Sequence, residues 1–498
     1  MNRKRTTTLL AGLGRSTTFC AAIAALLGAG VCAGATNDVP VETAAPDALA
    51  FNAGADLRVR QEIMHNVPGL PGGSGAVLPR AARKMQNHIR YRPRVWAQLD
   101  AGPFTLYGRL VDEMREYPVK NGVKRKNRSY TFPDEVVLDN LYLEGRGLFD
   151  GFLDFRFGRQ DLFLDGRSAV GLDRIMLDGT PADGSRSSFA DMLRVTLHPS
   201  DTSSLDVFAL YDNSRNDIRW GNHLSRGRAL TALHPSDSPD MDEWGGGIVW
   251  NDVLFDGGLP YQLYVVHKHA EAYTAPSGAR IPDKQVTTVG AHVMPEVNEN
   301  LSFDLDVAQQ FGTRSNGAQA GGAMAYAALD VHRAKSASGI HPYARLSAYY
   351  LSGDRHSTGE KNGDTAWDPM WSRAPQDSEL VQYGTLYALG YWSNMLYTKL
   401  TLGTKFGAHH GLCAYSGPMW AAAQDHLGHA DGSGDSMFKG VLSVIRYDFP
   451  ILLAPKNARG TDRFEIFGHL LAEVFNPGDY YDTSRPSYFL RWEINIRF

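Results

Sequence analysis

The feature that most constrains this chain is a sustained alternation of apolar and polar residues. In residues 89–100 the odd positions are apolar and the even positions are mostly polar or charged, and Leu57, Val59 and Ile63 alternate with charged residues in the same way. Because successive side chains of a strand point to opposite faces, each such run has one apolar face and one polar face. The alternation therefore predicts an all-β fold.

The lengths of the runs and of the segments between them narrow the fold further. Each run is about ten residues long, which is the length of a tilted strand that crosses a membrane. Short connections at 100–103, 146–151, 198–203 and 295–300 alternate with long ones at 65–85, 116–134, 161–187 and 214–242. We count eighteen strands from Ala53 to Phe498. The pattern predicts a single 18-stranded antiparallel transmembrane β-barrel with short periplasmic turns and long extracellular loops.

The N-terminus has the pattern of an export signal. Residues 2–5 are basic or polar, residues 19–31 are apolar, and Ala33-Gly34-Ala35 supplies the small residues that a signal peptidase reads. We expect residues 1–35 to be a signal peptide that is cleaved after Ala35. A lipoprotein signal at Cys32 is the weaker alternative, because Val31 stands where a small residue is preferred.

This signal divides the chain and indicates its location. Residues 36–52 are expected to form a periplasmic N-terminal segment, and residues 53–498 the barrel in the bacterial outer membrane. Removal of residues 1–35 leaves one cysteine, Cys413, so no intramolecular disulfide can form.

Composition excludes several other classes of protein. A chain of 498 residues with 43% hydrophobic and 11% aromatic residues is not disordered. No segment after the N-terminus approaches the roughly 20 apolar residues of a spanning helix. The net charge of -4 gives no indication of nucleic-acid binding. A soluble β-protein would also alternate, but the export signal, the connection lengths and the terminal aromatic residue favour the barrel.

Several short motifs follow one another in a characteristic order. They are Arg-Pro-Arg-Val-Trp-Ala-Gln at 92–98, Leu-Tyr-Leu at 141–143, Phe-Arg-Phe-Gly-Arg-Gln at 155–160, Tyr-Leu-Ser-Gly-Asp at 350–354, Phe-Asn-Pro-Gly-Asp at 475–479 and the terminal Phe498. In these motifs the chain resembles the alginate-export family of outer-membrane proteins. The resemblance implies a monomeric barrel that passes a polyuronate through an arginine-lined pore, with loops and turns as gates.

The resemblance also bears on individual residues. It places Arg92 and Arg159 on motif positions of the family and matches Glu493 to an acidic position of the lumen. The chain departs from the family at Asp139, Asp161 and His469, where the alginate exporter has basic residues.

Charged residues on the polar faces of the strands are the candidates for lining the pore. They are Arg58, Arg60, Arg90, Arg92, Arg94, Arg109, Arg156, Arg159, Arg194, Arg345, Arg491 and Glu493, with Asp161 and Asp165 as candidates for the constriction. The first six are expected to form a ladder on one inner wall, and guanidinium groups there favour anions. Arg159 is out of phase with Arg156, which indicates a bulge or a strand end nearby. The alternative is that these arginines pair with carboxylates for stability.

These observations favour a channel for a hydrophilic, anionic solute such as a sugar acid or a polyuronate-like polysaccharide. A general non-selective porin is the first alternative, and a barrel enzyme or an adhesin is less favoured. We find no catalytic motif and therefore expect no enzymatic activity. We expect no cofactor. The direction of transport, export or uptake, stays open.

Other polar clusters have weaker interpretations. Asp161, Asp165, Asp173 and Asp178 predict a polar constriction or a plain loop, with a calcium site as the alternative. His267 and His269 share a strand face and His409-His410 lie in a turn, but neither pair has a third zinc ligand. Lys120, Lys124, Arg125, Lys126 and Arg128 predict a solvated loop, with lipopolysaccharide or acidic polysaccharide as alternative ligands.

The expected partners follow from the same interpretation. They are outer-membrane lipids and lipopolysaccharide, the solute, periplasmic export or uptake proteins, and the barrel-insertion machinery, which would read the terminal Phe498; nucleic acid is not among them. Some of the aromatic residues near strand ends are expected to form interface girdles, whereas others in the lumen could stack on sugar rings. These are Tyr91, Trp96, Tyr107, Tyr142, Tyr350 and Trp492.

Overall fold

The structure is a computed structural model that describes most of the chain after residue 48. The described residues are 49–66, 85–112, 114–120, 123–124, 137–161, 190–212, 243–255, 258–274, 280–332, 339–354, 365–371, 378–380, 393–407, 409–424, 435–453, 464–481 and 484–498. The predicted signal peptide lies outside these ranges. The first strand begins at Leu49, four residues before the predicted boundary at Ala53, because the alternation already starts there.

Eighteen strands form the wall of the molecule. They are β1 (Leu49–His65), β2 (Gln86–Ala101), β3 (Phe104–Val111), β6 (Val137–Gly147), β7 (Leu153–Gln160), β8 (Ala190–Leu197), β9 (Ser204–Asp212), β10 (Glu243–Leu254), β11 (Leu259–Ala270), β14 (Lys284–Val293), β16 (Leu301–Arg314), β18 (Ala323–His332), β19 (Ile340–Leu351), β20 (Met395–Phe406), β21 (His410–Trp420), β22 (Phe438–Leu453), β23 (Glu465–Pro477) and β24 (Ser487–Arg497).

Shorter elements extend or connect these strands. They are β4 (Met114–Lys120), which continues along β2 beyond β3, β5 (Val123–Lys124), β12 (Tyr273–Thr274), β13 (Arg280–Ile281), β15 (Glu296–Asn298), β17 (Gln319–Ala320) and the helical turn α3 (Leu148–Gly151). No helix in the described ranges is long and apolar enough to cross a membrane.

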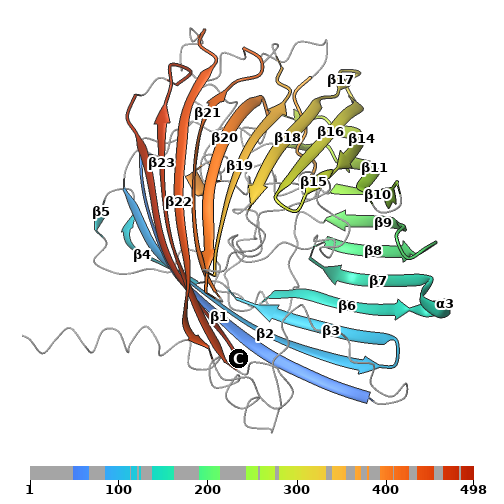
Figure 1. The fold of residues 1–498 in the computed structure, drawn as a ribbon. Coiled ribbons are helices and arrows are strands. Elements are labelled where there is room, and N and C mark those ends of the chain that lie inside the picture. Colours follow the sequence, from blue (N-terminus) through green and yellow to red (C-terminus); the bar gives the residue numbers. More distant parts are fainter. Residues whose placement is uncertain are drawn as a thin grey trace, which may run out of the picture.

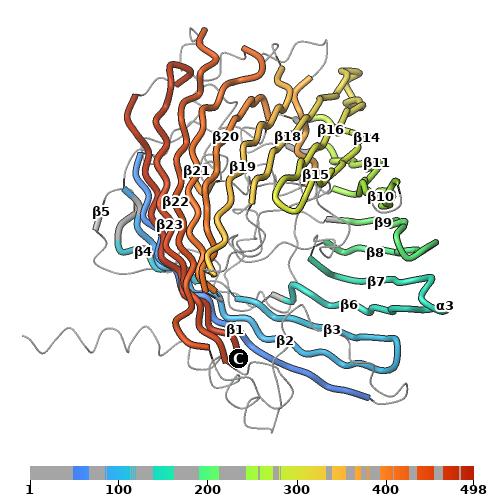
Figure 2. The backbone as a smooth tube through the Cα atoms, viewed as in Figure 1, coloured from blue at the N-terminus to red at the C-terminus, as the bar shows by residue number. Residues whose placement is uncertain are grey.

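The sheet closes on itself. Each strand of the wall pairs antiparallel with the one before it in the chain, and the last strand, β24, pairs with β1, where Arg60 lies opposite Glu493. Figures 1 and 2 show the first strands lying beside the last ones. Closure gives each of the eighteen strands of the wall a partner on both sides. The predicted all-β, 18-stranded antiparallel barrel is confirmed.

The two ends of the barrel have different connections. β1 starts and β24 ends at the same end, where the strand bounds leave connections such as 102–103, 198–203 and 407–409. The connections at the other end include residues 161–189, 213–242 and 352–394. We call these the short-turn end and the long-loop end. The side of the membrane on which each lies stays a prediction.

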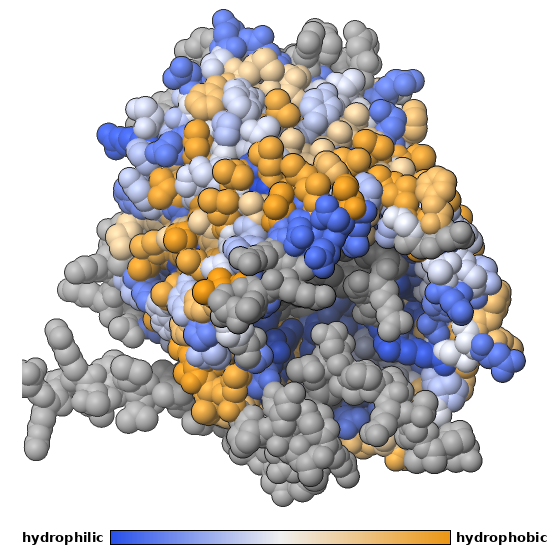
Figure 3. All heavy atoms as spheres, in the orientation of Figure 1, coloured by the Kyte–Doolittle hydropathy of each residue, from blue (hydrophilic) through white to orange (hydrophobic). Residues whose placement is uncertain are grey.

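The two faces of the wall follow the alternation of the sequence. Outward positions are apolar and exposed, as at Leu106 (49%) and Leu402 (55%), whereas Arg58 on the inner face is 1% exposed. In Figure 3, hydrophobic residues gather on the visible outer surface and hydrophilic ones lie inside the opening. A wall that is apolar outside and polar inside suits a barrel surrounded by lipid.

The C-terminal strand has the predicted faces, and it leads to a first testable prediction. The Phe498 N–H donates to the Ala55 carbonyl at 2.9 Å, and its ring lies 5.3 Å from the ring of Phe464 on the outer side. Deletion of Phe498 is expected to reduce the amount of folded protein sharply, because it removes both the seam hydrogen bond and the aromatic terminus. Heat-modifiable mobility on gels measures the folded fraction.

A substitution separates the two contributions of this residue. Phe498→Ala keeps the backbone hydrogen bond and removes only the ring. If insertion depends on the aromatic terminus, Phe498→Ala should fold as poorly as the deletion. Wild-type levels of folded protein for the deletion would rule out both roles.

Candidate solute channel

The predicted arginine ladder lies on the inner wall beside the barrel seam. In the strand pairing, Arg58 lies opposite Arg92 and Arg60 lies opposite Arg90. All four residues are at most 4% exposed. Like charges directly opposite each other are unfavourable unless anions compensate them, so their partners decide what this wall can do.

Glu62 compensates much of this positive charge. Its carboxylate lies 2.9 Å from Arg60 Nε, 2.6 Å from His88 Nε2 and 2.6 Å from Arg491 Nη2, and it is 0% exposed. Arg90 Nη1 approaches it at 3.4 Å. Together these residues form what we call the seam network, in which Glu62 is the shared acceptor for side chains of β1, β2 and β24.

Glu493 adds a second carboxylate to this wall. Its Oε2 lies 3.6 Å from Arg60 Nη1 and 4.0 Å from Arg58 Nε, and His469 Nδ1 lies 3.9 Å from its Oε1. The ladder is therefore paired with carboxylates inside the wall, as the alternative in the sequence analysis proposed. It is not a row of uncompensated cations.

The remaining lumen arginines are paired in the same way but are less buried. The pairs are Arg94–Asp56 (2.8 Å), Arg109–Asp139 (2.8 Å), Arg109–Asp161 (2.8 Å), Arg156–Glu144 (2.7 Å), Arg194–Asp206 (2.9 Å) and Arg345–Asp330 (2.6 Å). The inner wall thus presents alternating positive and negative groups. Asp161, a predicted constriction residue, belongs to this wall as a partner of Arg109, and Asp165 lies outside the described residues.

Arg159 does not lie where the sequence analysis placed it. It has the phase of Phe157, which is 61% exposed on the outer face, and it pairs with the exposed Asp191 at 2.9 Å. Gly158, just before it, has a φ of +125°, a conformation that a residue with a Cβ rarely adopts. The pairing of β7 with β6 and with β8 has no register shift, so no bulge separates Arg156 from Arg159; the predicted strand end lies at Gln160, and the alternation alone turns Arg159 away from the lumen.

Three aromatic residues expected in an interface girdle face the lumen instead. Trp96 and Tyr107 stack with ring centroids 6.1 Å apart, and Tyr107 and Tyr142 with centroids 5.1 Å apart. The Arg156 guanidinium lies 4.6 Å from the Tyr142 centroid. Because these rings stack on one another, the faces that they share are not open to a sugar ring. Tyr91, Tyr350 and Trp492 have the outward phase that a girdle requires.

Among the described residues, an obstruction of the lumen that was not predicted from the sequence is the connection from β19 to β20. Residues 365–371 of this connection dock on β11, β14 and β16. Lys284 Nζ lies 2.9 Å from the Asp368 carboxylate, and Lys268 Nζ donates to the Met370 carbonyl at 2.7 Å. The Gln310 side chain exchanges two hydrogen bonds with the Asp368 backbone, of 2.7 and 2.8 Å. We call this contact region of residues 365–371 the apolar anchor, because it also buries large apolar side chains.

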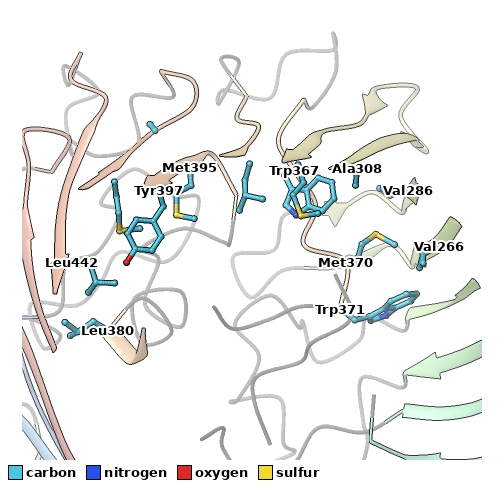
Figure 4. Close-up of a cluster of buried hydrophobic side chains, with 14 of the residues drawn as sticks. Val266, Val286, Ala308, Trp367, Met370, Trp371, Leu380, Met395, Tyr397 and Leu442 are labelled. Atoms are coloured by element: carbon cyan, nitrogen blue, oxygen red, sulfur yellow. The ribbon is translucent and has the colours of Figure 1, made fainter. Parts of the chain in front are cut away.

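Large apolar side chains fill the space at this anchor. Trp367, Met370 and Trp371 are at most 2% exposed and belong to the same buried cluster as Val266 and Val286. Figure 4 shows these residues facing one another in the lumen. A signal existed in the sequence, since two tryptophans and a methionine within five residues are unusual in a long polar connection.

The ionic contact at this anchor is fixed in its charged form. Burial alone would raise the pKa of the Asp368 carboxyl, but the charges of Lys284 and Lys268 and the hydrogen bonds from Lys284 and the Met370 N–H outweigh it. The pKa of Asp368 is therefore held below its ordinary value. The carboxylate stays ionised and paired across the physiological pH range.

A second contact holds the same connection to the opposite side of the barrel. Glu473 on β23 accepts hydrogen bonds from Ser378 Oγ (2.7 Å) and from the backbone N–H groups of Glu379 (2.9 Å) and Leu380 (3.1 Å). Glu379 Oε1 in turn accepts from Arg491 Nη1 at 2.7 Å. We call this the polar anchor. In Figure 4 the two anchors lie on opposite sides of the lumen, with Leu380 near Leu442 at the polar one.

The other predicted polar clusters are only partly tested by the structure. His267 and His269 share the outer face of β11, where Trp244 stacks on His269 at 4.9 Å. His410 lies in β21 and not in the turn, with its Nδ1 2.9 Å from the Tyr447 hydroxyl. Asp173, Asp178, Arg125, Lys126 and Arg128 lie outside the described residues. Within the described ranges, no group of three or more His, Cys, Asp or Glu side chains is arranged to hold a metal ion.

Comparison with known proteins gives structural similarity only. No family model and no curated protein matches the chain. Among solved structures, OprB of Pseudomonas putida aligns over 90% of this chain and 94% of its own, with 11% identity and a TM-score of 0.39. OccK5 (OpdH) of Pseudomonas aeruginosa aligns over 90% and 98%, with 9% identity and a TM-score of 0.46. A BenF-like porin of Pseudomonas fluorescens aligns over 90% and 98%, with 9% identity and a TM-score of 0.44. The fold assignment rests on the strand pairing, and the resemblance to the alginate-export family stays a prediction.

Proposed function

We propose that this protein is an outer-membrane channel for small hydrophilic solutes. The observation that carries the proposal is a closed 18-stranded barrel with an apolar outer face and a charged lumen that one connection crosses. Barrels of 16 to 18 strands are wide enough to enclose an aqueous channel. The export signal of the sequence supports the bacterial outer membrane as its location, with lipids and lipopolysaccharide as its surroundings.

The charges of the inner wall and the connection that crosses the lumen determine which solutes the channel favours. Ion pairs along the wall, such as Arg94–Asp56 and Arg156–Glu144, favour a weakly selective channel over strict anion selection. The connection that crosses the lumen favours small solutes over a polysaccharide chain. We therefore put a general channel with modest anion preference first, with a sugar acid as the preferred solute. A polyuronate, as the alginate-export resemblance implies, comes second.

Two other classes remain as alternatives. A barrel enzyme is disfavoured by the lack of a catalytic motif in the sequence. An adhesin would conduct negligibly, so conductance in a planar bilayer distinguishes it from a channel.

Selectivity can be tested at Arg92 and Arg94. Replacing both by alanine removes two positive groups from the inner wall and leaves the Asp56 carboxylate without its 2.8 Å partner. The reversal potential in a salt gradient is expected to move toward cation selectivity, because the lumen loses positive charge while the barrel stays closed.

The opposite charge change provides the control. Asp56→Asn should move the reversal potential toward anion selectivity. A double variant with the reversal potential of the wild type would show that these arginines have only a structural role.

A further inference from the structure

We propose that Arg491 is a carboxylate-binding site that Glu379 occupies in this structure, and that a solute carboxylate can take the place of Glu379 and release the polar anchor. The ligand class is a small sugar acid. This inference rests on the proposed channel function and adds to it a binding residue and a way in which the solute changes the lumen.

The guanidinium of Arg491 has one fixed and one exchangeable partner. Its Nε and Nη2 donate to Glu62 Oε1 at 3.1 and 2.6 Å, within the fully buried seam network. Its Nη1 donates to Glu379 Oε1 at 2.7 Å, and the Glu379 side chain is 10% exposed. Glu62 belongs to the wall, whereas Glu379 comes from the connection. A carboxylate from solution can satisfy Nη1 equally well, because the guanidinium is suited to that group.

Packing holds the guanidinium in position for such a ligand. The Arg491 Cζ lies 5.1 Å from the centroid of the Phe489 ring, which is itself 0% exposed. Phe489 and Glu62 together define the plane of the guanidinium, so its Nη1 stays directed at the position of the Glu379 carboxylate when that carboxylate leaves. The site is therefore preformed.

The two anchors differ in how a solute can affect them. The apolar anchor contains three buried apolar side chains, Trp367, Met370 and Trp371, with which a dissolved ion cannot compete. The polar anchor buries one apolar side chain among its described residues, Leu380, and otherwise consists of hydrogen bonds to Glu473 and the Glu379–Arg491 ion pair, which is the contact that a carboxylate in solution can replace. An anionic solute should therefore release residues 378–380 and leave residues 365–371 docked.

The charges at the polar anchor also favour exchange. The Glu379 carboxylate and the Glu473 carboxylate are brought together, since the Glu379 N–H donates to Glu473 Oε1 at 2.9 Å while its side chain reaches Arg491. Like charges held close together in a poorly solvated site repel each other. A solute carboxylate at Arg491 lets Glu379 move away from Glu473, which relieves this repulsion.

The first test measures binding without relying on conduction. Calorimetric titration of the detergent-solubilised full-length protein with sodium glucuronate should show binding that is stronger in Glu379→Ala than in the wild type. If Glu379 leaves about 10% of the Arg491 sites free in the wild type, its removal strengthens the apparent affinity for glucuronate about tenfold. Glu296→Ala, which removes an exposed carboxylate of β15, is the control and should bind as the wild type does.

The second test measures conductance in planar bilayers. Glucuronate, but not glucose, should raise the conductance of the wild type, and Glu379→Ala should already conduct at the higher level without responding to glucuronate. Glu379→Gln, which keeps a weaker hydrogen-bonding group, should lie between them.

The outcomes separate this inference from the proposed function. Equal glucuronate affinity in the wild type and in Glu379→Ala, or equal effects of glucose and glucuronate on conductance, would overturn the inference while a conducting wild type upheld the channel. If the wild type and Glu379→Ala are both folded and neither conducts, the proposed channel function is wrong. The proposed opening of the lumen by a solute is then wrong as well.

Discussion

Replacing Glu62 by alanine is expected to destabilise the barrel by about 3–5 kcal/mol, the range for removing one partner of a buried ion pair. Glu62 accepts contacts from Arg60, His88 and Arg491 at 2.6 to 2.9 Å, and none of these side chains is more than 3% exposed. Alanine would leave their positive charge poorly compensated at the seam where β1 meets β24. The midpoint of urea unfolding in lipid vesicles, followed by heat-modifiable mobility, should fall.

A pair on the outer face supplies the matched control. Asp191 also binds an arginine, Arg159, at 2.9 Å, but its side chain is 48% exposed. An exposed ion pair contributes only about 0.2–1 kcal/mol, so Asp191→Ala should leave the midpoint nearly unchanged. Equal losses in the two variants would mean that Glu62 is no more important to the seam than a surface carboxylate.

The barrel and the faces of its strands could be predicted from the sequence because both follow from the regular geometry of a β-strand. The two-residue period of a strand assigns each side chain to one face. Arg58 and Arg60 alternate with Leu57 and Val59, and in the structure the arginines are inside. The same rule would have placed Trp96 in the lumen, since it has the phase of Arg92 and Arg94. An interface girdle requires the outward phase, so the alternation itself argues against a girdle position for Trp96.

The rest of the lumen depends on contacts between distant residues, which no local pattern encodes. The partners of Arg491 are Glu62, at the other end of the chain, and Glu379, in a long connection. Arg159 is the exception, because the alternation already gave it the outward phase and only its position in a motif of the family placed it in the lumen. The crossing of the lumen depends on Lys284 and Glu473, which meet the connection only after the barrel has closed.

Replacing residues 353–393 by a two-residue Asn-Gly turn is expected to raise single-channel conductance severalfold. The ends of this segment are already adjacent, since the Asn394 N–H donates to the Ser352 carbonyl at 3.1 Å and Leu351 pairs with Met395. A tight hairpin can therefore join β19 to β20 without disturbing their register. Removal of both anchors leaves the charged wall as the limit to ion flow. Planar-bilayer recording in potassium chloride measures the change.

Releasing one contact of the apolar anchor should have a smaller effect, and this comparison shows whether the connection obstructs the lumen. Lys284→Met breaks the 2.9 Å ion pair with Asp368 but keeps Trp367 and Trp371 in place, so the conductance should stay near that of the wild type, with more frequent fluctuations. Native heat-modifiable mobility of the shortened variant shows that its barrel is closed. If that closed variant conducts no better than the wild type, ion flow is limited elsewhere, and the paired arginine wall of β1, β2 and β24 becomes the candidate for the narrowest part of the channel.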